Sequence, residues 1–393
     1  MEYQELIFKE EKEMGYILSE ESKELVKAAK QFAEGRLKPV VAECDRTGEP
    51  PMDVYKEAFD LGYNLLEVPE EYGGLGLDYY TVCAIYEEFA KVDLGFCSSL
   101  AAAGLALKPV IKNGTPEQIQ YFADFLTGDK GNGWSAFALT EPDAGSDAAN
   151  SKVTAVRDGD EFVINGRKCF CTNAGFASIF VVFAVTDKSA GVKGLSAFIV
   201  EADRPGLSIG KEEDKMGIRL SNTTDVVFDD VRIPAKNMLG KEGKGFKYAM
   251  ETLDLARPVV AAMAVGLSQR CIEESVSYTK ARITFGKPVI KNQVTQFKLA
   301  DMEIKTEAAR ACVINCFNHY YAGLPFGEQA AIAKCFAGDV AVENALEAIQ
   351  MHGGYGYSRE YPVEKLLRDA KILQIYEGTN EVQRIVVAGN VCR

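Results

Sequence analysis

The sequence predicts an α+β protein that begins with helices, continues as an antiparallel β domain and ends in a helical bundle. Three observations predict this order. Helical periodicity dominates residues 19–130, alternating runs broken by Gly, Pro and Asp dominate 134–234, and long helical periods return from about residue 245. The βαβ alternation of a dinucleotide-binding sheet is missing from this order.

The first segment contains two clear helix signals. Near "LSEESKELVKAAKQFAEGRL", four apolar residues recur at helical spacing and predict a buried face: Leu25, Ala28, Ala29 and Phe32. In "TPEQIQYFADFLTG", Thr115 suits the N-cap, Pro116 the first turn and Gly128 the stop. We therefore expect a helix between Thr115 and Gly128.

The middle segment has the composition of strands. In "EFVINGRKCF", Asn165-Gly166 separates two alternating runs and predicts a β-hairpin turn. The runs "IFVVFAV", "LSAFIVEA" and "TTDVVFDDVRIP" follow as further strands.

The last segment predicts long helices. "VTQFKLADMEIKTEAARACVINCFNHYYAG" and "EQAAIAKCFAGDVAVENALEAIQMHGG" each keep a helical period, and their small residues let helices pack closely. The glycine clusters "GGLGLD", "GKEGKGF" and "GGYGYS" do not complete G-x-G-x-x-G, and a P-loop is also missing. If the protein binds a nucleotide cofactor, it does so by another route.

The composition excludes several classes of protein. The chain has 393 residues, 47% of them hydrophobic and 26% charged, which is ordinary for a globular protein with a substantial core. Its net charge of -13 argues against a nucleic-acid binder, which needs a basic footprint. We find no apolar run near the about 18 residues of a membrane span and no signal-peptide order, so we expect a cytoplasmic protein.

Cysteine and histidine usage points away from metals. The ten cysteines are scattered without a C-x-x-C pair, and we expect them to be reduced and mostly buried. The two histidines, His319 and His352, form no zinc spacing and no Ser-His-Asp pattern. We predict no metal site.

Three short motifs carry candidate chemistry. "FALTEPDAGSDAA" (137–149) offers Thr140, Ser146 and closely spaced turn amides that suit an anionic or carbonyl-bearing ligand, although a plain surface loop explains it equally well. "RKCFCTNAG" (167–175) places Phe170 and Thr172 where they could flank a planar ring, or simply pack in a core. "QIYEGTNEVQR" places Glu377 after a helix, where most glutamates are solvated.

Together with "ARITFGKPV", "LDLARPVVAAMAVG" and "QMHGGYGYSREYPVEKLLRDAKILQIYEGT", these motifs resemble the acyl-CoA dehydrogenase family of flavoenzymes. The resemblance runs from about residue 18 to the C-terminus with every domain in order. It implies a helical domain at 18–133, a β domain at 134–244 and a four-helix bundle at 245–393, usually assembled as a homotetramer, a dimer of dimers. Residues 1–17 form an unassigned extension.

The resemblance gives Glu377 a role. In the family, the carboxylate of "YEGT" removes the α-proton of an acyl-CoA thioester while the β-hydrogen leaves as hydride to flavin N5. The thioester carbonyl must be polarised as enolate charge develops. The resemblance implies that the Glu377 N–H and a ribityl hydroxyl of FAD are the donors. Some relatives carry the base on another helix, but here Ala256 stands at that place and cannot act as one.

The resemblance also implies FAD as cofactor, and it assigns residues to it one by one. Two segments would contact the flavin and pyrophosphate: Phe137, Leu139, Thr140, Gly145 and Ser146, then Phe170, Cys171 and Thr172. Other residues would reach the FAD of a neighbouring subunit: Arg282, Thr284, Phe285, Gln293, Gln350, Gly353 and Gly354. Thr379, Asn380 and Glu381 would complete the adenosine side. Phe170 stands where many relatives have tryptophan, which keeps an aromatic wall.

The implied substrate contacts lie on the same elements. Ser146 and the run Asp254, Leu255, Ala256 and Arg257 match positions that contact CoA, and Tyr376 would form one wall of the acyl slot. Arg257 also has a plainer interpretation as a surface ion pair on a helix.

Acyl length, direction and electron partner stay open. The small run Ala101–Ala103 could leave room for a medium or bulky acyl group, or could serve close helix packing. Cys97 stands where an arginine would indicate a dicarboxylic substrate such as glutaryl-CoA, which is therefore disfavoured. The same residues serve dehydrogenation or enoyl-CoA reduction, with electron-transfer flavoprotein as the expected partner. An oxidase and a catalytically silent scaffold are the alternatives.

Overall fold

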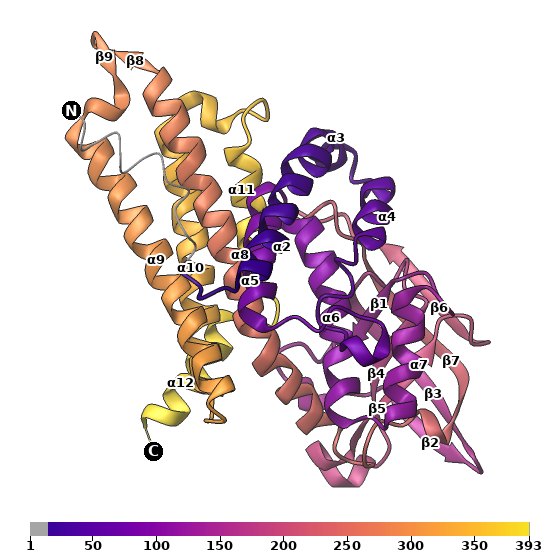
Figure 1. The fold of residues 1–393 in the computed structure, drawn as a ribbon. Coiled ribbons are helices and arrows are strands. Elements are labelled where there is room, and N and C mark those ends of the chain that lie inside the picture. Colours follow the sequence, from indigo (N-terminus) through magenta and orange to yellow (C-terminus); the bar gives the residue numbers. More distant parts are fainter. Residues whose placement is uncertain (1–14, 393) are drawn as a thin grey trace.

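The N-terminal part of the chain is helical (Figure 1). The computed structural model describes residues 15–392, so residues 1–14 of the unassigned extension lie outside the described residues. The helices are α2 (Glu20–Phe32), α3 (Lys38–Thr47), α4 (Met52–Asp60), α5 (Tyr79–Val92), α6 (Leu94–Asn113) and α7 (Pro116–Thr127). A π-helical turn at Ala33–Leu37 joins α2 to α3.

The buried face of α2 differs from the predicted one. Ala29 and Phe32 are buried as expected, but Leu25 is half-buried and Ala28 is exposed. Ser22 is buried, because its hydroxyl accepts a hydrogen bond from Thr81 of α5 at 2.9 Å. A satisfied hydroxyl can replace an apolar side chain at a helix contact, which periodicity alone does not reveal.

The predicted ends of α7 are confirmed. Thr115 is the N-cap, and it forms a capping box with Gln118, each side chain bonding the other residue's backbone N–H. Pro116 is the first helical residue. Gly128 ends the helix with a left-handed φ of 93°, a conformation that glycine adopts without steric cost.

Helix α6 overturns the expectation that no segment approaches membrane-span length. By length and composition alone it could cross a membrane, but 83% of its 18-residue apolar window is buried inside the protein. It packs against α5, α8 and the first strand, so we assign it as a core helix. Ala102 and Ala103 are buried there, which favours the close-packing interpretation of this alanine run.

One seven-stranded sheet forms the middle of the molecule. Its strands are β1 (Ser135–Ala138), β2 (Thr154–Asp158), β3 (Glu161–Thr172), β4 (Ile179–Val185), β5 (Leu195–Glu201), β6 (Leu207–Glu212) and β7 (Thr223–Pro234). The order is β1-β4-β2-β3-β7-β6, with β5 also paired to β4. The three predicted later strands are confirmed. The sheet is mixed rather than purely antiparallel, because β4 runs parallel to both β1 and β2.

The predicted hairpin at Asn165-Gly166 is wrong. Both residues lie inside β3, where the pairing with β7 is irregular between Ile164 and Gly166. Asn165 instead fixes the neighbouring strand, since its side chain accepts from the Asp230 N–H at 2.8 Å. The actual turn joins β2 to β3, because Asp158 pairs with Glu161 and leaves Gly159 and Asp160 between them.

Long helices form the C-terminal part. They are α8 (Gly245–Ala281), α9 (Gln293–Tyr321), α10 (Gly327–His352), α11 (Val363–Ala370) and α12 (Asn380–Val391), and a short hairpin of β8 (Ile283–Thr284) and β9 (Lys287–Pro288) lies between α8 and α9. Helices α8, α9 and α10 run side by side, and α12 packs on α10 (Figure 1). The helical bundle is confirmed.

The core is shared between these parts. One apolar cluster joins α2, α5 and α6 to α8, α9 and α10, and a second lies between α6, α7 and the sheet. All ten cysteines are free and six are buried, as expected for small core residues. The domain limits at 133/134 and 244/245 stay predictions; β1 begins at Ser135 and α8 at Gly245.

Candidate active site

Glu377 lies in the loop between the short 3-10 helix Lys371–Gln374 and α12. It adopts a left-handed φ of 57°, and Gly378 follows at 86°. The loop is held from α12: the Gln383 side-chain amide donates to the Glu377 carbonyl at 3.1 Å and to the Gly378 carbonyl at 2.8 Å. Thr379 caps the helix by accepting from the Val382 N–H. The loop is therefore a fixed structure that presents one carboxylate in an uncommon backbone conformation.

Glu377 is half-buried, and one oxygen of its carboxylate is enclosed by the protein. Within the described chain, its Oε2 atom is buried without a hydrogen bond. Burial raises the pKa of Glu377 above its usual range, and the positive charges of Arg257, Lys108 and Lys334 oppose that rise. A buried carboxylate with a raised pKa and a free oxygen is suited to accept a proton.

Arg257 of α8 supports the same loop. Its side chain is buried, with 4% of the residue exposed. Its Nη1 donates to the Asp254 carboxylate at 2.6 Å, and its Nε donates to the Glu377 carbonyl at 3.5 Å. The predicted alternative of an ion pair is thus correct for Asp254, but Arg257 itself is buried, whereas the Asp254 side chain is 32% exposed.

Lys334 of α10 approaches from the other side. Its Nζ donates to the Gly378 carbonyl at 2.7 Å and to the Asn380 side-chain oxygen at 3.0 Å. The Asn380 amide in turn donates to the Cys335 carbonyl and to Asp339. Asn380 is buried and fully engaged inside the chain, so its side chain positions this loop.

Lys108 of α6 is the third cation near Glu377. It is buried and pairs with Glu67, which lies in the connection between α4 and α5. Glu67 fits there because Gly104, one turn before Lys108, has no side chain; an added Cβ would collide with the Glu67 carboxylate. Ala101 and Leu105 share this face of α6 and are only half-buried.

Tyr376 and the start of α8 surround the loop with apolar surface. The Tyr376 hydroxyl is buried without a geometrically acceptable hydrogen bond, and burial raises the pKa of this group. Leu255 and Ala256 are buried on α8, and Ala256 supplies no carboxylate. Cys97 is in the core, where its thiol donates to the Tyr86 carbonyl.

The structure brings together the two predicted flavin segments of the sheet. The Cys169 N–H donates to the Thr140 carbonyl at 2.9 Å, and Lys168 donates to the Leu139 carbonyl at 2.8 Å. An irregular pairing of β3 with β7 between Lys168 and Cys171 gives Phe170 a φ of 54° and leaves it 65% exposed. Of the other predicted residues, Cys171 and Leu139 are buried, Phe137, Thr140 and Thr172 are half-buried, and Gly145 and Ser146 are exposed.

A second predicted group lies at the β8–β9 hairpin. Phe285 is fully exposed at its tip with a φ of 49°, and the Arg282 guanidinium lies over the Tyr355 ring, 5.8 Å from its centre. This contact places the hairpin beside Gly353 and Gly354. Thr284 is half-buried, and Gln293, Gln350 and Glu381 are exposed.

The hairpin group and the sheet group are far apart in one chain. Helix α8 begins beside β5 and ends at the hairpin, and its 37 residues span about 55 Å (Figure 1). A single chain therefore does not unite all predicted cofactor residues.

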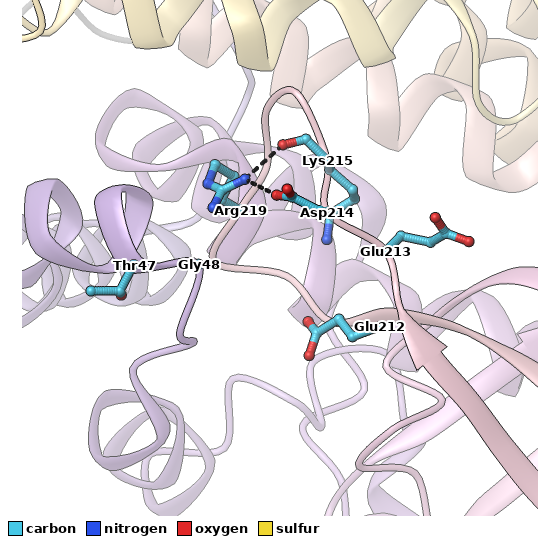
Figure 2. A pocket seen from close by; sticks show the side chains of 7 residues that line it. All are labelled: Thr47, Gly48, Glu212, Glu213, Asp214, Lys215 and Arg219. Atoms are coloured by element: carbon cyan, nitrogen blue, oxygen red, sulfur yellow. Dashed lines mark hydrogen bonds and ion pairs between the residues drawn. The ribbon is translucent and has the colours of Figure 1, made fainter.

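The pocket shown in Figure 2 is separate from the Glu377 loop and from both groups of predicted cofactor residues. It has a volume of about 190 Å³, and its lining residues are Thr47, Gly48, Glu212, Glu213, Asp214, Lys215 and Arg219. Arg219 donates to Asp214 at 2.6 Å and to the Lys215 carbonyl at 2.9 Å. It contains no predicted site residue, and its three carboxylates would repel a phosphorylated ligand.

Sequence reasoning missed Lys334, Gln383 and Lys108. Lys334 had a detectable signal: it lies on the same helical stripe as Ala330, Ala337 and Ala341, where a charged residue is unusual. Lys108 contacts Glu67, which is remote in sequence, and Gln383 donates to the carbonyls of the turn just before its own helix. Neither contact was predicted from the sequence.

Comparison with known proteins identifies the family. The chain matches the N-terminal domain of acyl-CoA dehydrogenases at residues 19–129, the middle domain at 136–231 and the C-terminal domain at 243–392. The chain belongs to the acyl-CoA dehydrogenase family.

Individual relatives cover nearly the whole chain. A short-chain-specific acyl-CoA dehydrogenase of Megasphaera elsdenii is 46% identical over 97% of this chain and 100% of its own. An acryloyl-CoA reductase (NADH) of Anaerotignum propionicum is 44% identical over 97% of both chains.

Solved structures agree with this placement. Butyryl-CoA dehydrogenase from Megasphaera elsdenii has a TM-score of 0.92 at 45% identity, covering 96% of this chain and 100% of that one. A chain from structural work on the electron transferring flavoprotein of Acidaminococcus fermentans, concerned with flavin-based electron bifurcation, has the same score and identity, covering 96% and 99%.

The cofactor of the family is FAD. An acyl-CoA dehydrogenase from Bacillus anthracis complexed with FAD has a TM-score of 0.88 at 34% identity, covering 96% of this chain and 68% of that one. The residues present here fit that group. Phe170 offers an exposed aromatic face beside the half-buried Thr172. In the described part of the chain, no atom other than those of the adjoining residues lies within 4 Å of the Cβ position at Gly145, Gly353 or Gly354.

Proposed function

We propose that this protein removes the α- and β-hydrogens of a short-chain acyl-CoA, with Glu377 as the α-proton base. The observation that carries the proposal is the Glu377 Oε2 atom, which within the described chain is buried without a hydrogen bond. The names of the Megasphaera relatives, short-chain specific and butyryl-CoA, support a short acyl group.

Different residues of this chain bind the substrate and transfer the proton. Glu377 Oε2 accepts the α-proton, and its enclosure keeps the carboxylate basic. Within the described chain the Glu377 N–H has no hydrogen-bond acceptor, so it is free to polarise the thioester carbonyl. When bound, FAD accepts the β-hydrogen as a hydride. Tyr376 excludes water on one side.

The CoA-facing residues have separate roles. Ser146 is exposed in a turn at the edge of the sheet and can contact the ligand directly. Arg257 and Asp254 neutralise one another and hold the Glu377 carbonyl, so they position the base. Thr379 and Asn380 do the same through the start of α12.

Electron-transfer flavoprotein is the proposed electron partner. The similarity to a chain from the Acidaminococcus electron transferring flavoprotein work supports this choice. A second candidate function is enoyl-CoA reduction by the same residues in reverse, supported by the acryloyl-CoA reductase among the relatives.

A homotetramer is the proposed assembly. The exposed aromatic Phe285 and the exposed apolar residues Phe297 and Ile304 of α9 support it, since large apolar side chains at a surface indicate contact with another chain. Sharing the cofactor between subunits would unite the two distant groups of predicted residues.

Anaerobic titration of the purified FAD-bound protein tests the proposal. Butyryl-CoA should bleach the long-wavelength flavin absorbance, and longer acyl-CoAs should bleach it less. Glu377→Gln should retain the flavin and lose bleaching by at least about 1,000-fold in rate, as expected for loss of an essential base. Bleaching that survives in Glu377→Gln would overturn the assignment of the base. Bleaching only by an enoyl-CoA acting on the reduced protein would favour the reductase.

A further inference from the structure

Lys334 is a charged residue in an apolar stripe of α10. Ala330, Ala333 and Ala337 around it are buried, and 1% of Lys334 itself is exposed. Taking an ammonium group out of water costs several kcal/mol unless hydrogen bonds and an opposite charge offset this cost. Specific interactions must therefore stabilise the buried Lys334 ammonium group.

The ammonium group ends in the turn that carries Glu377. It donates to the Gly378 carbonyl at 2.7 Å and to the Asn380 side chain at 3.0 Å, both neutral acceptors. Gln383 donates to the same Gly378 carbonyl at 2.8 Å. The peptide group after Glu377 therefore has two donors from two different helices, which fixes its orientation.

The charged groups facing Lys334 leave Glu377 as its counter-charge. These groups are Glu377 in the loop, Arg257 on α8 and Asp339 on α10. The Cys335 thiol also faces Lys334, but burial raises the pKa of this thiol and so favours its neutral form. Arg257 is paired with Asp254, while Asp339 is paired with Arg384 and accepts from Gln374 and Asn380. Among residues 15–392, the Glu377 Oε2 atom has no hydrogen-bond partner.

We propose that Lys334 is a positioning residue for the base: it fixes the Glu377–Gly378 turn and keeps a positive charge beside the Glu377 carboxylate. This rests on the proposed function only in taking Glu377 as the base. The charge favours the ionised carboxylate, so it offsets part of the effect of burial, which raises the pKa of Glu377.

The pH dependence follows from the two groups. Burial lowers the pKa of Lys334 to about 8, so its charge is present below that pH and is lost above it. Glu377 must be ionised to act as the base, and the positive charge of Lys334 favours that ionised form. Removing the charge of Lys334 should therefore raise the pKa of Glu377 and move the acid limb of the rate profile to higher pH.

Three substitutions separate charge from hydrogen bonding. Lys334→Met removes both, Lys334→Gln keeps a donor without charge, and Lys334→Arg keeps charge and donors. Lys305→Met is the matched control, because Lys305 forms an exposed ion pair with Glu343 on the neighbouring helix. Each variant is purified with FAD bound.

The measurement is the infrared carboxyl band of Glu377, identified by its loss in Glu377→Gln and followed against pH. The neutral variants should shift its titration to higher pH by about one unit, with Lys334→Arg and Lys305→Met close to the parent protein. The acid limb of flavin reduction by butyryl-CoA should shift equally. If both neutral variants keep the parent titration, the proposal is wrong, even where their activity is low.

A failure of the proposed function and a failure of the proposed role of Lys334 would give different results. If no acyl-CoA reduces the flavin of the parent protein, the proposed function fails, but the infrared titration still decides whether Lys334 acts on Glu377. If the parent is reduced and the titration does not move, only the role of Lys334 is overturned. If Lys334→Met does not fold, the Glu377 titration is measured in Lys334→Gln alone, and an unchanged titration there overturns the role of Lys334.

Discussion

At the scale of single residues, left-handed backbone occurs at three of the residues proposed to act in catalysis or cofactor binding. In the described chain six residues other than glycine have positive φ, and Phe170, Phe285 and Glu377 are among them. Such conformations cost about 1 kcal/mol or more and persist only where surrounding structure holds them. The strain lies at two aromatic residues proposed for the cofactor and at the proposed base, which is where precise orientation matters.

The first prediction concerns the stability cost of the Glu377 charge. Since burial raises its pKa in the folded protein, the folded state binds its proton more tightly, and stability is lost as pH rises through the folded pKa. Glu377→Gln should therefore be more stable than the parent at neutral pH, by about 1.4 kcal/mol for each unit of pKa shift. The difference should vanish well below pH 4. Denaturant unfolding of the FAD-bound protein across pH measures it, and equal stability at all pH values would contradict it.

The second prediction concerns Gly378. Its φ is 86°, and an added Cβ would lie 2.7 Å from the Gln383 side-chain amide. Gly378→Ala should cost about 2–3 kcal/mol, combining left-handed strain with displacement of Gln383, and should slow flavin reduction at least about tenfold. Thermal unfolding and stopped-flow reduction measure the two effects.

Gly323→Ala is the control for Gly378. Gly323 also has a left-handed φ, of 69°, but no atom of the other described residues, its chain neighbours aside, lies within 4 Å of its Cβ position. It should show only the backbone strain of about 1–2 kcal/mol and normal reduction. Equal losses of activity in the two variants would show that the contact with Gln383 is unimportant.

At the scale of elements, α6 combines a core helix with a charged end. Its apolar surface is buried against α8 and β1, yet Lys108 lies on the same face as Ala101 and Leu105. Lys108 is tolerated because Glu67 reaches it over Gly104. Lys108 also contributes positive potential at Glu377. One helix therefore supplies both core packing and part of the electrostatics of the site.

The third prediction follows from that pair. Lys108→Met leaves the Glu67 carboxylate buried without its cation and should cost about 3–5 kcal/mol. The double variant Glu67→Leu with Lys108→Met should recover most of the loss, because neither charge is then unpaired. Lys305→Met, which breaks an exposed pair, should cost at most about 1 kcal/mol. Urea unfolding measures all three, and a double variant as unstable as the single one would contradict the pairing argument.

Elements were predictable from the sequence where the signal is local. The ends of α7 follow from Thr115, Pro116 and Gly128, because caps and stops depend on neighbouring residues. The predicted turn at Asn165-Gly166 was wrong, because β3 pairs with β7 on both sides of these residues and so continues through them. The same limit applies to the site: the "YEGT" motif indicates Glu377, whereas Lys108 and Lys334 reach it only through tertiary packing.

At the scale of the whole molecule, buried ion pairs tie the parts together. Lys365 of α11 donates to Asp93, the N-cap of α6, and to Asp369, each at 2.5 Å. Asp369 also accepts from the Ile218 N–H in the loop before β7 at 2.6 Å. Arg310 of α9 pairs with Glu87 of α5 at 3.0 Å. The N-terminal helices, the sheet and the C-terminal helices are thus fixed to one another around the loop of Glu377.

The fourth prediction concerns assembly. Phe297 and Ile304 lie seven residues apart, on one face of α9, and both are exposed, as is Phe285 at the hairpin. If these side chains are covered by another subunit, Phe297→Asp places a charge in an apolar contact and should break the tetramer into smaller species. Because the hairpin residues would then lose the cofactor they share, FAD should also dissociate more readily. Sedimentation with simultaneous detection of protein and flavin measures both.

Val156→Asp provides the control for assembly. Val156 of β2 is 61% exposed, close to the 60% of Phe297, but lies on the central sheet rather than on the bundle. It should change neither mass nor flavin content. A Phe297→Asp protein that keeps the mass of the parent would place the subunit contact elsewhere. One that dissociates but retains FAD normally would show that a single chain holds the cofactor, and the residues at the β8–β9 hairpin would then need another explanation.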